Sequence, residues 1–255
     1  MEFVDFSVDG AVALVRLNRP PVNALSEQLN EELKQAFIDC QDDSIRAAVV
    51  TGQPHFAAGA DIKGFKETLD TGGKEVNASG LRDAIAILDT LAKPTIAAVH
   101  GYALGGGCEL SLGCDFRYMA EDAKIGQPEI LLGIIPGAGG TQRLQRVVGF
   151  QATKELTYSG RQVGAEEALA LGYADKVLPP DDVLDVALAD AAQWATKATA
   201  AIAAAKRALA EGRGLPLDEA IRVERDAFQE SFATDDAVEG VNAFIEKRET
   251  TFKGS

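Results

Sequence analysis

Short β-rich runs alternate with helical stretches through the first half of this 255-residue chain, and this alternation constrains the fold more than any other feature. A turn at Asp9-Gly10 joins the first two runs into a predicted hairpin, and Ser26 is placed to cap the first helix. The predicted strands are 3–8, 12–17, 47–51 and 95–99, and the predicted helices include 27–40 and 81–91. Strands separated by helical crossovers pair in parallel with right-handed connections, so the sequence predicts an α/β fold.

The second half of the chain is predicted to be mainly helical. No long strand pattern follows Val177, and breaks at Pro179-Pro180, 212–216 and 234–236 separate the helical stretches. The alanine-rich stretch 187–209 offers narrow helix surfaces that permit close packing. We therefore expect a β-rich core over residues 1–180 and a helical C-terminal region over residues 181–255.

The charge balance argues against nucleic acid as a partner. The chain carries 39 Asp and Glu against 25 Lys and Arg, and the resulting net charge of -14 repels a phosphate backbone. Its 3 cysteines lack paired metal-ligand spacing, which indicates a reducing compartment. The segment Met1 to Asp5 has no targeting character, and no apolar run is long enough for a membrane span. We expect a cytoplasmic protein with no membrane partner.

A run of three glycines, Gly105 to Gly107, follows the predicted strand at 95–99 and precedes a short helical stretch. Glycines permit a tight turn there, and a helix that begins at this point presents unpaired backbone N–H groups. Such groups stabilise negative charge on a ligand. The alternative, which the glycines alone leave open, is a close-packed turn without a function.

Two glutamates stand in apolar surroundings. Glu109 shares a helix face with Gly105, Gly106 and Leu112, and Glu129 is the one acid in the stretch 127–132. A single glutamate in a first helical turn is explained by the helix dipole alone. A pair of isolated carboxyl groups, however, is typical of acid–base catalysis in which the two pKa values are separated.

Other polar residues allow a structural explanation. His55 and His100 adjoin no nucleophile motif, and Cys108 falls on a different helix face from Glu109. Arg143 and Arg146, spaced by one helical turn, are suited either to phosphate binding or to ion pairs with the surplus acids. Asp61 is suited to hydrogen bonds within its own turn.

Three long blocks resemble the enoyl-CoA hydratase/isomerase (crotonase) superfamily. They are FAAGADIK at 56–63, KPTIAAVHGYALGGGCELSLGCD at 93–115 and GQPEILLGIIPGAGGTQRL at 126–144, and the similarity extends over essentially the whole chain. The resemblance implies a spiral of repeated ββα units followed by a helical trimerisation region, assembled as a homohexamer that is a dimer of trimers. It also implies a coenzyme A thioester as the substrate, with no metal and no separate cofactor.

The resemblance assigns roles to particular residues. The backbone N–H groups of Ala60 and Gly106 match the two oxyanion-hole donors, Glu109 and Glu129 match the catalytic pair, and Gly137 matches the glycine whose N–H orients Glu109. The residues that match substrate-binding positions are Ala58, Asp61, Ile62, Lys63, Phe228 and Lys247. The last two, in the helical region, are expected to reach a neighbouring subunit.

The expected activity is that of a lyase that adds water to a trans-2-enoyl-CoA in fatty-acid oxidation or related acyl-CoA catabolism. The alternatives are another reaction of the same fold, such as enoyl-CoA isomerisation or acyl-CoA hydrolysis, and a non-catalytic binding protein. Relatives with other reactions commonly change one or both acids, whereas Glu109 and Glu129 are both present here. The segment 65–86 is expected to shape the acyl-chain pocket together with the C-terminal helices.

Overall fold

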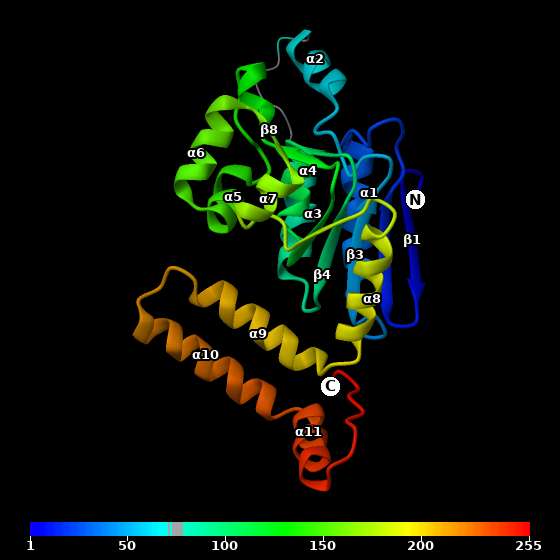
Figure 1. The fold of residues 1–255 in the computed structure, drawn as a ribbon, viewed down its shortest axis with the longest axis vertical. Coiled ribbons are helices and arrows are strands. Elements are labelled where there is room, and N and C mark those ends of the chain that lie inside the picture. The colour runs from blue at the N-terminus through cyan, green and yellow to red at the C-terminus, as the bar shows by residue number, and fades with distance from the viewer. Residues whose placement is uncertain (71, 73–78) are drawn as a thin grey trace.

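A six-stranded sheet forms the centre of the computed structural model, which describes residues 1–70, 72 and 79–255 (Figure 1). Its strands, in spatial order, are β1 (Val4–Asp9), β2 (Val12–Leu17), β3 (Ala47–Gly52), β4 (Thr95–Val99), β6 (Phe116–Ala120) and β9 (Lys176–Leu178). The β1–β2 pair is antiparallel, and all later neighbours pair in parallel. The predicted hairpin, the parallel pairing and the α/β class are therefore confirmed.

A second sheet of three short strands lies beside the first. It contains β5 (Tyr102–Leu104), β7 (Lys124–Gly126) and β8 (Gln162–Gly164), with β5 parallel to β7 and β8 antiparallel to it. The chain passes from the main sheet to the second one between β4 and β5 and again between β6 and β7, and it returns to the main sheet between β5 and β6 and between β8 and β9. This repeated passage agrees with the spiral that the family resemblance implies.

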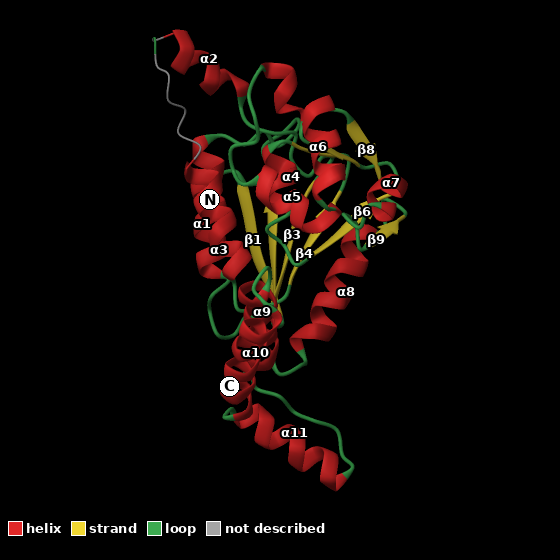
Figure 2. Cartoon of the chain, turned by 90° about the vertical axis from the view of Figure 1, so that its left-hand side faces the viewer, coloured by secondary structure: helices red, strands yellow, loops and turns green. Residues whose placement is uncertain are grey.

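Helices cover both faces of the main sheet (Figure 2). Helices α1 (Glu27–Asp39) and α3 (Ser79–Thr90) pack together on one face, and α8 (Val183–Ala195) covers the other. Ser26 caps α1 as expected, because its side chain accepts a hydrogen bond from the Leu29 N–H at 3.3 Å. Leu29, Leu33 and Phe37 are fully buried, so the apolar stripe of α1 faces the core.

The other helices of the core are α2 (Ile62–Asp70), α4 (Gly106–Ser111), the 3₁₀ helix η1 (Pro128–Leu132), α5 (Gly140–Val148), α6 (Phe150–Ser159) and α7 (Ala165–Ala170). Of these, α2, α4 and η1 follow the carboxyl ends of parallel strands, the edge at which ligands of open α/β sheets bind. The elements α4, η1 and α5 supply most of the candidate site.

The expected division at residue 180 requires a correction. Helix α8 lies beyond that point, yet Val183, Ala187 and Ala191 are fully buried against the main sheet. Small alanine side chains let this helix approach the strands closely, so α8 completes the core. The helical region that leaves the core begins after Ala195.

Helices α9 (Thr199–Gly212), α10 (Leu217–Phe232) and α11 (Asp235–Glu246) form an arm that extends from the core (Figure 1). Within the arm, α9 packs mainly against α10. The C-terminal tail returns toward the core, where Arg46 donates hydrogen bonds to the Phe252 carbonyl and to Thr199 Oγ1, both at 2.8 Å. No helix among the described residues is both long and apolar enough to cross a membrane.

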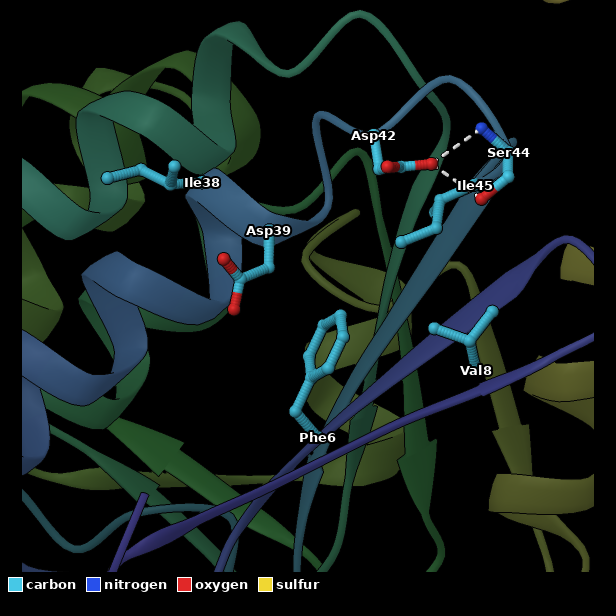
Figure 3. A pocket seen from close by; sticks show the side chains of 7 residues that line it. All are labelled: Phe6, Val8, Ile38, Asp39, Asp42, Ser44 and Ile45. Carbon is cyan, nitrogen blue, oxygen red and sulfur yellow. Dashed lines mark hydrogen bonds between the residues drawn. The ribbon is translucent and has the colours of Figure 1, made fainter.

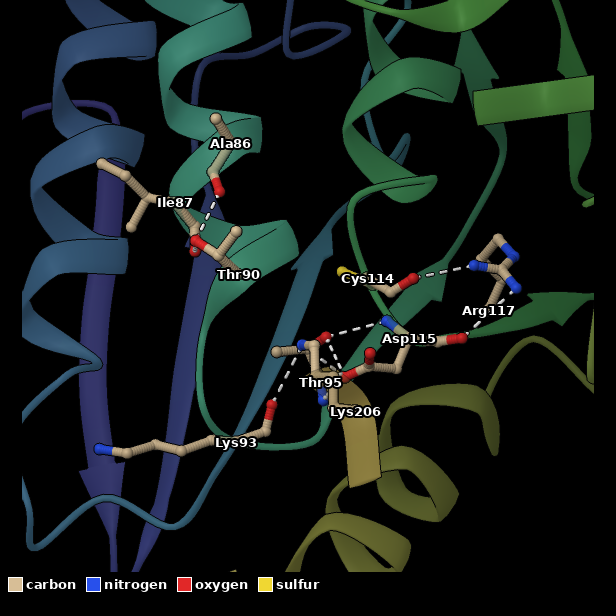
Figure 4. A network of polar contacts seen from close by, with 9 residues as sticks. All are labelled: Ala86, Ile87, Thr90, Lys93, Thr95, Cys114, Asp115, Arg117 and Lys206. Atoms are coloured by element: carbon tan, nitrogen blue, oxygen red, sulfur yellow. Dashed lines mark hydrogen bonds and ion pairs between the residues drawn. The ribbon is translucent and has the colours of Figure 1, made fainter. Parts of the chain in front are cut away.

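A polar network ties the arm to the core (Figure 4). Lys206 on α9 donates to Asp115 Oδ2 at 2.9 Å, and the same oxygen accepts hydrogen bonds from the N–H and hydroxyl groups of Thr95, each at 2.9 Å. Lys206 is only 16% exposed, so its charge is partly withdrawn from water. The ion pair thus fixes α9 at the start of β4.

Replacing Lys206 with methionine keeps the apolar stem and removes the charge. We expect Lys206→Met to weaken the docking of α9 by about 1–3 kcal/mol, because Asp115 loses a charged hydrogen-bond partner. Hydrogen–deuterium exchange should show faster exchange of the α9 amides. The matched control is Lys197→Met, at an exposed position just before α9. Equal exchange in the two variants would contradict the anchoring role.

Candidate active site

The segment that follows β3 runs alongside β5. The Ala57 N–H donates to the Tyr102 carbonyl, and the Leu104 N–H donates to the Ala57 carbonyl, both at 3.0 Å. These two bonds form a parallel bridge between residues 57 and 103. The segment 56–61 is therefore held in place beside the chain that leads into α4.

Ala60 lies in a second parallel bridge, with Leu25 on the other side of the segment. The Leu25 N–H donates to the Gly59 carbonyl at 2.8 Å, and the Asp61 N–H donates to the Leu25 carbonyl at 3.0 Å. In such a bridge the central residue directs its own N–H away from the partner. The Ala60 N–H consequently points away from Leu25, and it donates to no protein group among the described residues.

The three glycines bring α4 against this segment. Gly105 has a φ of 52°, and a Cβ on Gly107 would lie 2.0 Å from the Ala57 carbonyl oxygen. A Cβ on Gly106 would lie 3.9 Å from the Ala60 nitrogen, so the backbone groups of these two residues are neighbours. Gly106 is the first residue of α4, and its N–H has no acceptor in the preceding turn. The two predicted donors are thus brought together.

Glu109 is buried in α4, with only 3% of its surface exposed. Its Oε1 accepts hydrogen bonds from the N–H groups of Ala138 and Gly140, both at 2.7 Å. The prediction that the Gly137 N–H orients Glu109 is wrong. Among the described residues, the N–H groups that donate to Glu109 are those of Ala138 and Gly140. Ala138 lies two residues before α5 and Gly140 is the first residue of α5, so both N–H groups that contact Glu109 come from the amino-terminal end of α5.

The charge state of Glu109 is set by opposing influences. Burial raises the pKa of its carboxyl group above the ordinary value. The N–H groups of Gly140 and Ala138 and the positive charge of Arg143 act in the opposite direction, because each stabilises the carboxylate. Glu109 therefore has specific partners for its ionised form.

Glu129 lies across the site, in η1. Its Oε1 is 2.9 Å from the point that a Cβ on Gly105 would occupy, so the carboxyl group touches the start of α4. The pKa of Glu129 is raised to about 7, chiefly by burial and additionally by the charge of nearby Glu109. Among the described residues, no cation or pair of backbone donors stabilises its charged form as at Glu109, so the effect of burial is less offset at Glu129.

Gln127 is a buried neighbour of this carboxyl group to which the sequence assigned no role. In the amide orientation that satisfies both of its polar atoms, its nitrogen lies 3.0 Å and 3.2 Å from the two carboxyl oxygens of Glu129. The sequence feature that could have indicated this role is the position of Gln127 directly before Pro128 and Glu129. The contact fixes the direction in which Glu129 points.

The other predicted site residues fall into two groups. Ala58 and Asp61 belong to the segment 56–61, while Ile62 and Lys63 are exposed at the start of α2. Asp61 accepts a hydrogen bond from the Lys63 N–H at 3.2 Å and pairs with Arg19 at 2.7 Å, which confirms the expected local hydrogen bonding.

Phe228 and Lys247 lie on α10 and at the end of α11, in the arm and not beside α4 (Figure 1). Phe228 is 56% exposed, and its ring stacks on Phe232. Of the segment expected to shape an acyl pocket, residues 71 and 73–78 lie outside the described part of the chain.

A surface cavity of about 560 Å³ occurs elsewhere (Figure 3). It is lined by Phe6 and Val8 of β1, by the end of α1 and by the loop at 42–45, whereas the candidate site is built from the 56–61 segment, α4, η1 and α5. Within residues 1–70, 72 and 79–255, no group of three or more His, Cys, Asp or Glu side chains is placed to hold a metal ion.

Two neighbouring backbone N–H groups beside two carboxyl groups with different partners are suited to an enzyme that moves protons next to a carbonyl group. A family model described as enoyl-CoA hydratase/isomerase matches residues 7–255. The chain therefore belongs to the enoyl-CoA hydratase/isomerase family.

Individual relatives agree with this membership. The chain is 39% identical to a short-chain-enoyl-CoA hydratase of Clostridium acetobutylicum, over 94% of this chain and 93% of that one. It is 40% identical to a crotonyl-CoA hydratase of Syntrophomonas wolfei, over 94% of each chain. A crystal structure of an enoyl-CoA hydratase from Bacillus anthracis superimposes with a TM-score of 0.91 at 36% identity, over 99% of this chain and 100% of that one.

The contact between Gly107 and Ala57 gives a test of the site geometry. Gly107→Ala should destabilise the fold by about 3 kcal/mol or more, since the added methyl group meets a carbonyl oxygen that the β5 pairing holds fixed. Thermal unfolding at matched concentrations measures the loss. Gly164→Ala is the control, because a Cβ there meets no atom within 4 Å. Equal melting temperatures would show that the two segments are not in close contact.

Proposed function

We propose that this protein is an enoyl-CoA hydratase, a lyase that adds water across the double bond of a trans-2-enoyl-CoA to give a 3-hydroxyacyl-CoA. The observation that carries the proposal is the placement of two carboxyl groups, buried Glu109 and half-buried Glu129, beside the Ala60 and Gly106 donors, with different partners for each acid. The names of the Clostridium and Syntrophomonas relatives support the same reaction. Fatty-acid oxidation or related acyl-CoA catabolism would supply such a substrate.

The N–H groups of Ala60 and Gly106 bind the thioester oxygen. When water attacks the β-carbon, negative charge moves onto this oxygen and an enolate forms. Fixed donors therefore stabilise the transition state more than the substrate. No side chain is needed for this step, and small residues at both positions leave room for the thioester.

The two carboxyl groups divide the proton transfers. Glu109, ionised, takes a proton from the water as its oxygen bonds to the β-carbon. Glu129, protonated, gives its proton to the α-carbon as the enolate collapses. With a pKa of about 7, Glu129 is protonated in acidic solution, half protonated near neutral pH and ionised in more alkaline solution.

The remainder of the coenzyme A lies along Ala58, Asp61, Ile62 and Lys63. The exposed Lys63 side chain offers positive charge near the segment, whereas Asp61 contributes backbone groups because its carboxylate is engaged by Arg19. Phe228 and Lys247 complete the nucleotide site of a neighbouring subunit. Coenzyme A belongs to the substrate, and the reaction proposed here uses no further cofactor.

The arm is the trimerisation element of a homohexamer built as a dimer of trimers. Its helices expose large apolar side chains, among them Leu217 (76%), Phe232 (61%), Phe244 (85%) and Ile245 (71%). Exposed apolar surface on this scale marks an interface.

Light scattering should therefore report a hexamer at micromolar concentration. Phe244→Asp should shift the protein toward smaller species, because it places a charge on the apolar face of α11. Lys253→Asp, a charge change in the nearby tail, is the control. A wild-type monomer would refute both the assembly and the shared nucleotide site.

Crotonyl-CoA hydration tests the activity, followed as loss of the conjugated enoyl absorbance. Glu109→Gln and Glu129→Gln should each lower kcat by about 10² or more while thioester binding is retained, because each removes a proton transfer and preserves shape. Glu121→Gln, at an exposed position, should be neutral.

The same measurement separates the alternatives. A chain that needs only Glu109 would belong with enoyl-CoA isomerases, and release of free coenzyme A from saturated acyl-CoA would indicate a hydrolase. Thioester binding without turnover on any chain length would indicate a binding protein.

A further inference from the structure

The loop before α5 holds Glu109 through two backbone donors that aim at one oxygen atom. The N–H groups of Ala138 and Gly140 both donate to Oε1 at 2.7 Å. The peptide group that joins Ala138 to Gly139 lies between these two donors. Two donors converge on one acceptor only when the peptide group between them is held in orientation. That central peptide group contains the Ala138 carbonyl.

Arg143, in the first turn of α5, holds this carbonyl. Its Nη1 donates to the Ala138 oxygen at 3.1 Å, and its Nη2 donates to Asp89 Oδ2 on α3 at 3.2 Å. A Cβ on Gly139, whose φ is 107°, would lie 2.1 Å from Nη1, so the guanidinium group lies directly on the backbone at Gly139. Arg143 thereby links α3, the loop and α5.

The position of the guanidinium group is maintained at some energetic cost. Its Nε is buried and has no hydrogen-bond partner among the described residues. Asp89 is half exposed, and an ion pair with such a partner contributes little stability by itself. The main effect of the interaction with Asp89 is therefore to orient the guanidinium group, because it adds little to the stability of the fold.

The charged and titratable groups around Glu109 come from four elements. Arg143 on α5 is the cation that acts on it, Glu129 of η1 is the facing acid, and Cys108 is its neighbour on α4. Asp89 on α3 acts through Arg143. Among the described residues, Arg143 is the cation that offsets the burial of this carboxylate.

We propose that Arg143, oriented by Asp89, is a positioning residue that keeps Glu109 ionised and held by both of its backbone donors. The proposal rests on the proposed function, in which Glu109 activates the water. Arg143 touches no reacting atom and acts through the Ala138 peptide group and through its charge.

Four variants test the proposal: Arg143→Met, Arg143→Lys, Asp89→Asn and the control Arg146→Met. The Arg146 side chain donates to the Gln142 carbonyl of its own helix and not to the loop. Steady-state hydration of crotonyl-CoA is measured from pH 5 to pH 9, with thermal melting to verify that each variant is folded.

Arg143→Met should lower kcat about tenfold or more with KM changed less than twofold, since the base is affected and not substrate binding. The acid limb of kcat/KM should move to higher pH by about half a unit to one unit, because loss of the cation makes the carboxylate easier to protonate. Arg143→Lys should return the acid limb of kcat/KM to its wild-type pH but recover only part of kcat. Asp89→Asn should have a smaller effect than Arg143→Met on both quantities.

An Arg143→Met profile that overlays the Arg146→Met profile would overturn the proposal. If Arg143→Met does not fold, the Arg143→Lys and Asp89→Asn profiles decide, and wild-type values in both would overturn it equally. Titration of the Glu109 carboxyl group by infrared difference spectroscopy, assigned with Glu109→Gln, is independent of turnover. An inactive wild-type enzyme would refute the proposed function, while an unchanged infrared titration midpoint in folded Arg143 variants would refute the role of Arg143.

Discussion

The contact between the start of α4 and the 56–61 segment is the constraint on which the site depends. Gly107 has no side chain, so the Ala57 carbonyl can approach the helix to a distance at which a methyl group would collide. This approach joins the loops that follow two adjacent strands, β3 and β4. It brings the Ala60 and Gly106 donors together and places Glu109 one turn further along, in the interior.

Burial of two carboxyl groups in one site separates their protonation states. Both lose hydration, but Glu109 gains two N–H groups and a nearby guanidinium group, whereas Glu129 has chiefly an amide neighbour. Like charges also oppose simultaneous ionisation of the two acids. In the proposed reaction, this difference lets two residues of the same type serve as the base and the acid.

Periodicity and residue chemistry predicted the first four strands of the main sheet and singled out both carboxyl groups, because each depends on local pattern, but the short strands β6 and β9 were not predicted. The hairpin, the Ser26 cap and the isolation of Glu109 and Glu129 are visible within a few residues of sequence. The orienting donors were misassigned to Gly137, since spacing in a glycine-rich loop does not determine which N–H faces α4. The role of Arg143 stayed open because its partner Asp89 is 54 positions away in the chain.

The order of contacts along the chain has a consequence for synthesis. Helix α8 is the last element to pack on the main sheet, and the arm that follows it packs mainly on itself. Every residue of the catalytic constellation in α4, η1 and α5 precedes that point. A chain that grows from its N-terminus can therefore complete its catalytic core before the arm emerges from the ribosome.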